Sequence, residues 1–241
     1  MSKIFAHRGF SSKYPENTML AFKKAIEIGV DGIELDVQLT KDGVPVIIHD
    51  ETLERTTDGQ GNIIDFTYDE ISKLDASYKF KNLNIVNKIP TLNEYFDFVK
   101  DYNIVTNLEL KTSVIEYFGI EEKVFELIKK YKLENNIIIS SFNHYSVLRF
   151  KKLAPNIKCG FLTESWLIDA GKYTQKNRVE CYHPYFKNLT PEVIKELKSS
   201  NIEINTWTVN KKRDMEYLIK QNIDVIITNH PDLLKDILSS I

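Results

Sequence analysis

The chain has 241 residues, of which 42% are hydrophobic and 27% are charged, and its formal net charge is −2. This length suits one large α/β domain or two small ones, and the hydrophobic share is enough for a sizeable core. Because the net charge is small and both signs are interspersed, the sequence gives no reason to expect a nucleic acid or a membrane surface as a partner.

The first residues and the cysteines indicate the compartment. The Met-Ser-Lys start lacks the apolar segment and the cleavage site of a signal peptide. No uncharged apolar stretch approaches the ~20 residues of a membrane span. Cys159 and Cys181 have no metal-type spacing and lie in apolar, strand-like runs, so we expect buried free thiols. We therefore expect a cytoplasmic protein without stable membrane insertion.

Short runs of β-branched or aromatic residues alternate with helical stretches along the chain. We expect strands at 3–7, 32–37, 104–110, 136–142, 157–162, 179–183, 202–208 and 223–228. We expect helices at 18–28, 91–101, 116–131, 143–153, 190–200, 210–221 and 231–239. Asn17 or Thr18 is placed to cap the first helix, and Thr190 before Pro191 marks the start of a later one.

Residues 44–50 form an apolar run that does not fit the alternation. Only Lys41-Asp42-Gly43 separates this run from the second strand, and Asp-Gly between apolar runs predicts a hairpin. Successive parallel strands need a much longer crossover, so we interpret residues 44–50 as an antiparallel return arm. Eight β/α units remain, which is the count of a (β/α)₈ barrel. A doubly wound open sheet is the alternative, although no Gly-x-Gly-x-x-Gly follows the first strand.

Residues 51–90 interrupt the alternation with a long stretch of little regular pattern. Such a stretch is usually functional or a small inserted subdomain. We expect it to be an insertion over one end of the barrel, so that residues 1–241 form a single domain.

Acidic residues lie toward the ends of the second and third strands of the expected barrel. Glu34 and Asp36 are two residues apart, so both side chains point to one face of the strand, and Glu109 and Lys111 repeat that spacing. Three carboxylates from neighbouring strands repel one another unless a cation lies between them. Oxygen ligands select a hard ion, so the sequence predicts one Mg²⁺ or Ca²⁺ at the end of the barrel where catalytic groups lie.

Basic and imidazole groups accompany these carboxylates. Arg8 and Lys111 could hold a phosphate, because cations stabilise the negative charge that develops in phosphoryl transfer. His7 and His49 follow apolar runs, and imidazole titrates near neutral pH, so both could act as acid or base. His183 ends a later strand and could line the same pocket.

Ordered motifs over essentially the whole chain resemble the glycerophosphodiester phosphodiesterases. They are His7-Arg8-Gly9, Pro15-Glu16-Asn17-Thr18, Glu34-Leu35-Asp36-Val37, Asp42-Gly43-Val44-Pro45-Val46, His49-Asp50, Arg55-Thr56-Thr57, Ile89-Pro90-Thr91-Leu92, Leu108-Glu109-Leu110-Lys111, Ser140-Ser141-Phe142, Trp207-Thr208-Val209-Asn210 and Thr228-Asn229-His230-Pro231-Asp232. The resemblance implies a (β/α)₈ barrel that hydrolyses glycerophosphodiesters to sn-glycerol 3-phosphate and an alcohol.

The resemblance also implies roles for single residues. The positions that match the metal ligands are Glu34, Asp36 and Glu109. Those that match the general acid–base pair are His7 and His49, and those that match phosphate contacts are Arg8 and Lys111. Pocket positions at which members differ are Tyr182, His183 and Trp207, so the preferred alcohol is not fixed.

Two other functions stay open at this stage. A phospholipase acting on lysophospholipids would need an apolar entrance, to which several aromatic residues could contribute: Phe10, Phe66, Tyr68, Phe80 and Trp166. A barrel that binds a phosphate ligand without turnover is the second. The sequence does not predict an oligomeric state, nor whether a cyclic phosphate forms or water attacks directly.

Overall fold

Parallel strands close into a ring in the computed structural model, which describes residues 1–77, 80 and 86–240. Within these residues the ring has eight strands, namely β1 (Lys3–His7), β2 (Gly32–Leu39), β4 (Val105–Leu110), β5 (Ile137–Ser141), β6 (Lys158–Thr163), β7 (Cys181–Pro184), β8 (Glu203–Thr206) and β9 (Val225–Thr228). The first strand closes the ring because it pairs with both β2 and β9. The predicted (β/α)₈ barrel is therefore confirmed, and the open-sheet alternative is wrong.

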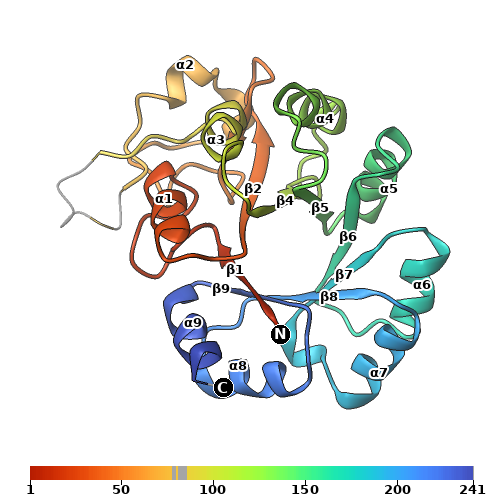
Figure 1. The fold of residues 1–241 in the computed structure, drawn as a ribbon. Coiled ribbons are helices and arrows are strands. Elements are labelled where there is room, and N and C mark those ends of the chain that lie inside the picture. The colour runs from red at the N-terminus through yellow and green to blue at the C-terminus, as the bar shows by residue number, and fades with distance from the viewer. Residues whose placement is uncertain (78–79, 81–85, 241) are drawn as a thin grey trace.

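Helices surround the ring of strands (Figure 1). They are α1 (Met19–Glu27), α3 (Leu92–Val99), α4 (Ile120–Tyr131), α5 (His144–Leu153), α6 (Ala170–Lys176), α7 (Pro191–Ser199), α8 (Lys212–Lys220) and α9 (Pro231–Ser239). Thr18 caps α1, and Thr190 caps α7 with Pro191 at its first position, as predicted.

Helix α6 was not predicted from the sequence. Its inward face consists of the small residues Ala170, Gly171 and Thr174, so the helix lacks the large apolar residues that make a helical period visible. Small residues are required here because a Cβ at position 171 would lie 2.6 Å from the Ser200 hydroxyl beside α7. The close packing of α6 therefore requires small residues, and these hide the apolar period by which the other helices were predicted.

The predicted return arm is present as β3 (Pro45–Ile47), which runs antiparallel to β2. The segment that follows contains the 3-10 turn η1 (Ile63–Asp65) and the short helix α2 (Tyr68–Ile71). It packs on β3 through a small apolar cluster made of Val46, Ile48, Leu53, Ile63, Ile71, Ala76 and Ile89. Part of the predicted insertion, residues 78–79 and 81–85, lies outside the described residues, and the single-domain assignment stays a prediction.

The alternation of each strand separates two environments. On β2, Ile33, Leu35 and Val37 point outward into the main core shared with the helices, while Glu34 and Asp36 point into the barrel. Burying each aliphatic side chain contributes roughly 1.5–3 kcal/mol to folding. The alternation thus anchors β2 from outside and leaves its inner face available for polar groups.

An apolar plug fills the middle of the barrel. It consists of Phe5, Ile138, Cys181, Val225 and Ile227, with Val105 and Trp207 packed against it. Both cysteines of the chain are buried and free, as predicted.

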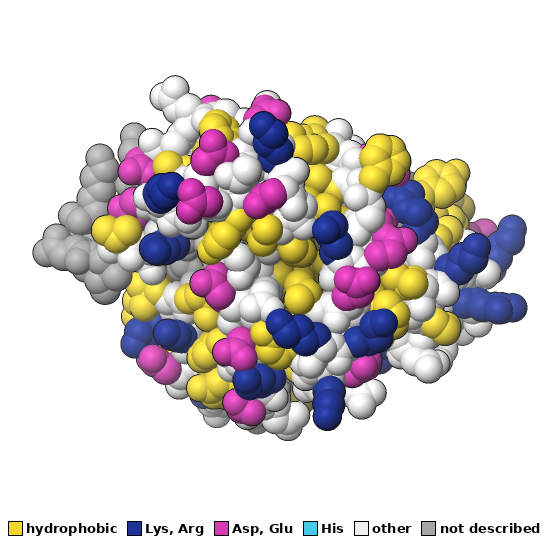
Figure 2. Space-filling view, turned by 90° about the horizontal axis from the view of Figure 1, so that it is seen from above, with side chains coloured by type: hydrophobic (Ala, Val, Ile, Leu, Met, Phe, Trp, Pro, Cys, Tyr) yellow, Lys and Arg dark blue, Asp and Glu magenta, His cyan; other side chains and the backbone are white. Residues whose placement is uncertain are grey.

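The outer surface seen in Figure 2, over α2, α3 and α4, carries basic and acidic side chains in alternation. This view agrees with the interspersed charges of the sequence. No described helix is long and apolar enough to cross a bilayer.

The turn between β1 and α1 requires glycine at position 9. Gly9 has a φ of +77°, and a Cβ there would lie 2.7 Å from the backbone carbonyl carbon of Ala21 in α1. Close approach of the turn to α1 lets the Phe10 amide donate to the Ala21 carbonyl over 3.1 Å. This contact fixes the direction in which His7 and Arg8 leave the strand.

Replacing Gly9 by alanine should cost more stability than the same change at Gly119. Gly119 has a φ of +82° but nothing within 4 Å of its added Cβ, so Gly119→Ala should lose only the left-handed strain of about 1–2 kcal/mol. Gly9→Ala should lose about 1–3 kcal/mol more, because its Cβ also meets backbone. Urea unfolding of both variants measures this, and equal losses would contradict the proposed contact.

Candidate active site

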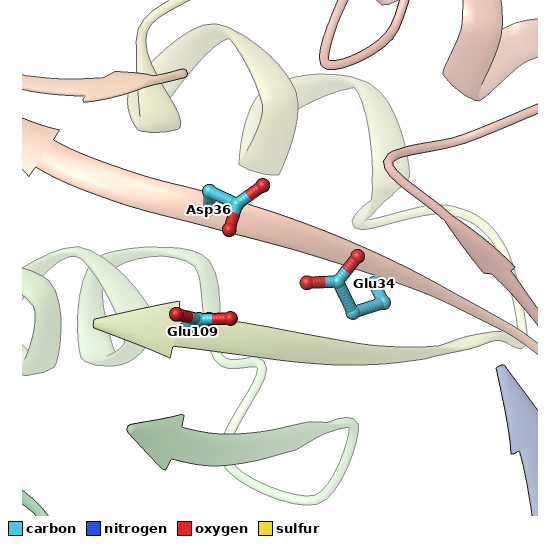
Figure 3. Close-up of side chains that lie close together, drawn as sticks. All are labelled: Glu34, Asp36 and Glu109. Carbon is cyan, nitrogen blue, oxygen red and sulfur yellow. The ribbon is translucent and has the colours of Figure 1, made fainter. Parts of the chain in front are cut away.

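Three carboxylates meet inside the barrel, at the carboxyl ends of its strands. Glu34 and Asp36 come from β2 and Glu109 comes from β4, and one oxygen from each lies within 4.8 Å of the others. Figure 3 shows the three groups turned toward one another across the two strands. They are buried, with exposed fractions of 4%, 1% and 7%. The predicted grouping on one inner face is therefore present.

Burial and mutual repulsion make this cluster unfavourable in its fully ionised form. Burial, together with the charges of Asp36 and Glu109, raises the pKa of Glu34 well above its usual value. Burial also raises the pKa of Glu109, as does the charge of Asp36. Burial alone would raise the pKa of Asp36, but the charges of Arg8, His49 and Lys111 hold it below its usual range.

The donor set fits a divalent cation. Asp36 Oδ1 is buried and accepts no hydrogen bond from the described residues, although Lys111 Nζ lies 4.0 Å away. A buried oxygen without a hydrogen bond is costly. Three carboxylates from two rigid strands supply hard oxygen ligands, which suit Mg²⁺ or Ca²⁺ better than softer metals. The cluster is therefore able to hold one metal ion.

The loop after β1 orients these carboxylates. The Arg8 amide donates to Glu34 Oε2 over 3.0 Å, and the Asn17 side-chain amide donates to Asp36 Oδ2 over 2.8 Å. Arg8 and Asn17 both have left-handed backbones, with φ values of 55° and 56°. Such residues persist where surrounding contacts determine the backbone. From the sequence, Asn17 was expected only as a possible cap of the first helix; its bond to Asp36 was not predicted.

Each candidate catalytic histidine has one ring nitrogen held by an acceptor. His7 Nδ1 lies 2.6 Å from Asn229 Oδ1, and His49 Nδ1 lies 2.6 Å from Asp50 Oδ1. Because both oxygens accept, the Nδ1 atoms carry the protons and the Nε2 lone pairs are left for other partners. Burial and the neighbouring Arg8 lower the pKa of His7 to about 3, so its ring is neutral near pH 7.

Two cations lie beside the carboxylate cluster. Lys111 Nζ is 2.9 Å from Glu109 Oε1 and 3.2 Å from His49 Nε2. Arg8 Nε is 3.3 Å from Asp36 Oδ2. Their positive charges offset part of the triad's negative charge and provide donors for an anionic ligand.

These groups surround a pocket of about 280 Å³. Its polar wall contains His7, Arg8, Glu34, His49, Asn107 and Glu109, and its apolar wall contains Phe142, Leu162, Trp207 and Ile227. A more open hollow of about 760 Å³ lies at the opposite end of the barrel, among Lys158, Arg178 and Glu203, and none of the predicted site residues lines it. Of these two, only the pocket of about 280 Å³ brings histidines together with the carboxylate cluster.

Of the three pocket positions suggested by the resemblance, one lines the pocket and two do not. Trp207 lines the pocket. His183 does not line it; its ring is fully buried with Nε2 3.1 Å from the Asn205 side-chain amide, and its carbonyl accepts from the Trp207 indole over 2.8 Å. Tyr182 points outward into the core with the helices. A role for His183 in binding stays a prediction, and it would act through Trp207.

An ion-pair network that the sequence analysis did not foresee links the two ends of the site. Arg55 donates to both carboxylate oxygens of Glu16 over 2.8 Å and also pairs with Asp50. Glu16 accepts a further bond from Arg8 over 2.8 Å. Burial would raise the pKa of Glu16, but its bonds to Arg55 and Arg8 lower it to about 2. The network therefore stays charged and holds Asp50 against His49.

The model of the glycerophosphoryl diester phosphodiesterase family matches residues 7–233. The chain belongs to this family. A glycerophosphodiester phosphodiesterase from Caldanaerobacter subterraneus subsp. tengcongensis is 47% identical over 231 residues, which cover 96% of this chain and 95% of the relative. The resemblance predicted from the motifs is thus confirmed.

Solved structures of the family share the fold. One from Silicibacter pomeroyi, 23% identical, covers 100% of this chain and 94% of its own with a TM-score of 0.92. Another is an Oleispira antarctica phosphodiesterase in complex with the product sn-glycerol-3-phosphate; it is 27% identical, covers 99% of this chain and 97% of its own, and has a TM-score of 0.88.

A divalent cation should stabilise the folded enzyme through the carboxylate cluster. At a concentration about 100-fold above the dissociation constant, binding adds ~2.7 kcal/mol and raises Tm by roughly 5–10 °C. Thermal unfolding with Mg²⁺ or Ca²⁺, each against EDTA, measures this shift. Glu109→Gln should reduce it strongly, whereas Glu122→Gln, at an exposed carboxylate on α4 that does not line the pocket, should not. Equal shifts in both variants would contradict the site.

Proposed function

We propose that the enzyme hydrolyses glycerophosphodiesters to sn-glycerol 3-phosphate and an alcohol in the pocket of about 280 Å³. The observation that carries this proposal is the presence of two histidines, each held through Nδ1, in the same pocket as a buried metal-type carboxylate cluster. The family match and the product complex of the Oleispira relative support the choice of substrate class.

Arg8 and Lys111 would bind the phosphate, because both are charged and face the carboxylate cluster. A bound Mg²⁺ or Ca²⁺ would neutralise phosphate charge and act as a Lewis acid. Glu34, Asp36 and Glu109 would hold that ion. Which of the two ions the enzyme uses is decided by adding each to enzyme that has been dialysed against EDTA.

The histidines would move the protons. One Nε2 takes a proton from the glycerol hydroxyl that attacks phosphorus, and the other Nε2 gives a proton to the departing alcohol. A cyclic phosphate results, and water then opens it while the two rings exchange roles. In the alternative route, one ring takes the proton from a water molecule that attacks directly. Trapping a cyclic phosphate during turnover would support the first route, and direct attack by water forms no such intermediate.

The Nδ1 proton of His7 is held by Asn229 Oδ1, so its Nε2 lone pair is placed to accept a proton in the first step. The Asp50 carboxylate holds the His49 ring through Nδ1, and Lys111 Nζ lies 3.2 Å from its Nε2, where the ammonium can supply the proton that His49 passes on. These contacts favour His7 as the first acceptor and His49 as the donor to the leaving alcohol.

The phospholipase alternative is favoured by the apolar wall formed by Phe142, Leu162 and Trp207. Trp166, which was also suggested for an apolar entrance, is 64% exposed in the loop after β6. Two of the aromatic residues suggested for an apolar entrance do not support it, because Phe10 is buried in the core and Phe66 packs on the small cluster beside β3. Comparing kcat/KM for glycerophosphocholine and for lysophosphatidylcholine decides between the two substrate classes.

Removing either imidazole should lower turnover and leave the fold intact. His7→Ala and His49→Ala should each reduce kcat by roughly 10²–10⁴, the usual contribution of a general acid or base. His230→Gln is the matched control, because His230 does not line the pocket. Release of sn-glycerol 3-phosphate gives kcat, and thermal unfolding checks the fold. Near-full activity in either alanine variant would remove that residue from the mechanism.

Asp50 and Arg55 should act as positioning residues for His49. Asp50→Asn and Arg55→Gln should reduce kcat by about 10–100-fold with little change in KM, because they misplace the ring without touching the substrate. Glu54→Gln, a neighbouring exposed carboxylate that bonds to Gly61 over 2.9 Å, is the control. A rise in KM with unchanged kcat would show that these residues serve binding instead.

A further inference from the structure

Exposed apolar side chains gather at the carboxyl end of three neighbouring strands. They are Val114 and Phe118 after β4, Tyr145 after β5, and Trp166, Leu167 and Ile168 after β6. Phe118 is 87% exposed, Trp166 is 64% exposed and Ile168 is 89% exposed. Because β4, β5 and β6 are adjacent in the barrel, their loops form one sector of its edge. We refer to these six residues as the apolar rim.

The apolar rim borders the mouth of the active-site pocket. Phe142 follows β5 and Leu162 belongs to β6, and both line the pocket. Tyr145 and Trp166 lie three and four residues further along the same loops. The apolar wall of the pocket and the exposed rim therefore belong to the same two segments of chain.

Most of the carboxylates within this sector are already paired. Glu116 accepts from Arg149 over 3.1 Å, and Asp169 accepts from Lys172 over 3.1 Å. Glu122 and Glu164 are exposed and have no recorded ion pair among the described residues. Because Arg149 also pairs with Glu121, this sector keeps a small net negative charge, so attraction to an anionic surface has to come from the basic sector beside it.

The next sector of the edge is basic. Lys187 follows β7, and Lys211 and Lys212 follow β8, and all three are exposed. For Lys187 and Lys211 no carboxylate partner is recorded in the part of the chain that the structure describes, and Lys212 is 3.9 Å from Glu216. Basic and apolar groups therefore lie side by side around one opening.

We propose that the apolar rim and these lysines dock the enzyme on an anionic lipid surface. Tryptophan and tyrosine favour the boundary between water and lipid, and exposed aliphatic groups gain from burial among acyl chains. Lysines near anionic head groups add electrostatic attraction that salt screens. A second copy of the chain is the weaker occupant, because a symmetric contact through this edge would bring the exposed lysines of both copies together.

The proposal concerns binding and holds whether or not the reaction is the one proposed above. It also qualifies the expectation from net charge, which gave no reason for a membrane-surface partner. A net charge of −2 describes the whole chain, whereas docking depends on the charges of one edge.

Sedimentation of the full chain with vesicles tests the proposal in EDTA, so that no turnover occurs. We expect binding to phosphatidylglycerol–phosphatidylcholine vesicles, weaker binding to phosphatidylcholine alone, and loss of binding as salt is raised. The triple variant Phe118→Ser, Trp166→Ser, Ile168→Ser should bind about ten-fold or more weakly. Tyr102→Ser should bind normally, because Tyr102 is 43% exposed in the loop before β4, at the other end of the barrel.

A charge variant keeps the test decisive if the triple variant folds poorly. Lys187→Glu with Lys211→Glu should lose the salt-sensitive part of vesicle binding and retain hydrolysis of soluble glycerophosphocholine. The proposal would be overturned if the wild type did not bind vesicles, or if the rim variant and the charge variant both bound as well as the wild type. It would also be overturned if the wild type were a dimer that the triple variant dissociates. None of these outcomes affects the assignment of the reaction, which is measured separately on the soluble substrate.

Discussion

Repulsion among three buried carboxylates is the constraint that organises this structure. Glu34, Asp36 and Glu109 are held within 4.8 Å of one another by two paired strands that cannot separate without opening the barrel. The outward residues of the same strands, such as Leu35 and Leu108, are fully buried in the main core, so folding energy from the helical shell maintains the strained inner face. The cation-type site is therefore a product of the whole barrel and not of one loop.

Positive groups around the cluster are themselves fixed by a second layer of ion pairs. Glu16 bonds to Arg8 and Arg55, and Arg55 continues to Asp50 and thus to His49. Arg55 comes from the segment inserted after β3, so the insertion contributes to the geometry of the barrel's active site. The segment that interrupts the β/α alternation is in this respect part of the catalytic framework.

Local patterns in the sequence were sufficient for the barrel and for the metal-type cluster. The two-residue spacing of Glu34 and Asp36 places both on one face of β2, because side chains alternate along a strand. The pairing of Glu16 with Arg55 was not predictable in this way, since the two residues are 39 apart in the chain and meet only through tertiary structure. Helix α6 was missed because its packing depends on small residues, and the buried position of His183 could not be read from a strand end alone.

The apolar plug inside the barrel limits how the substrate can enter the pocket and how the products can leave it. Side chains such as Phe5 and Val225 close the centre of the ring, and a cavity of about 300 Å³ at the far end stops at the same residues. The substrate and both products must therefore pass through the same opening. The product that binds deeper in the pocket can dissociate only after the other has left, so the depth of the pocket imposes an order on release.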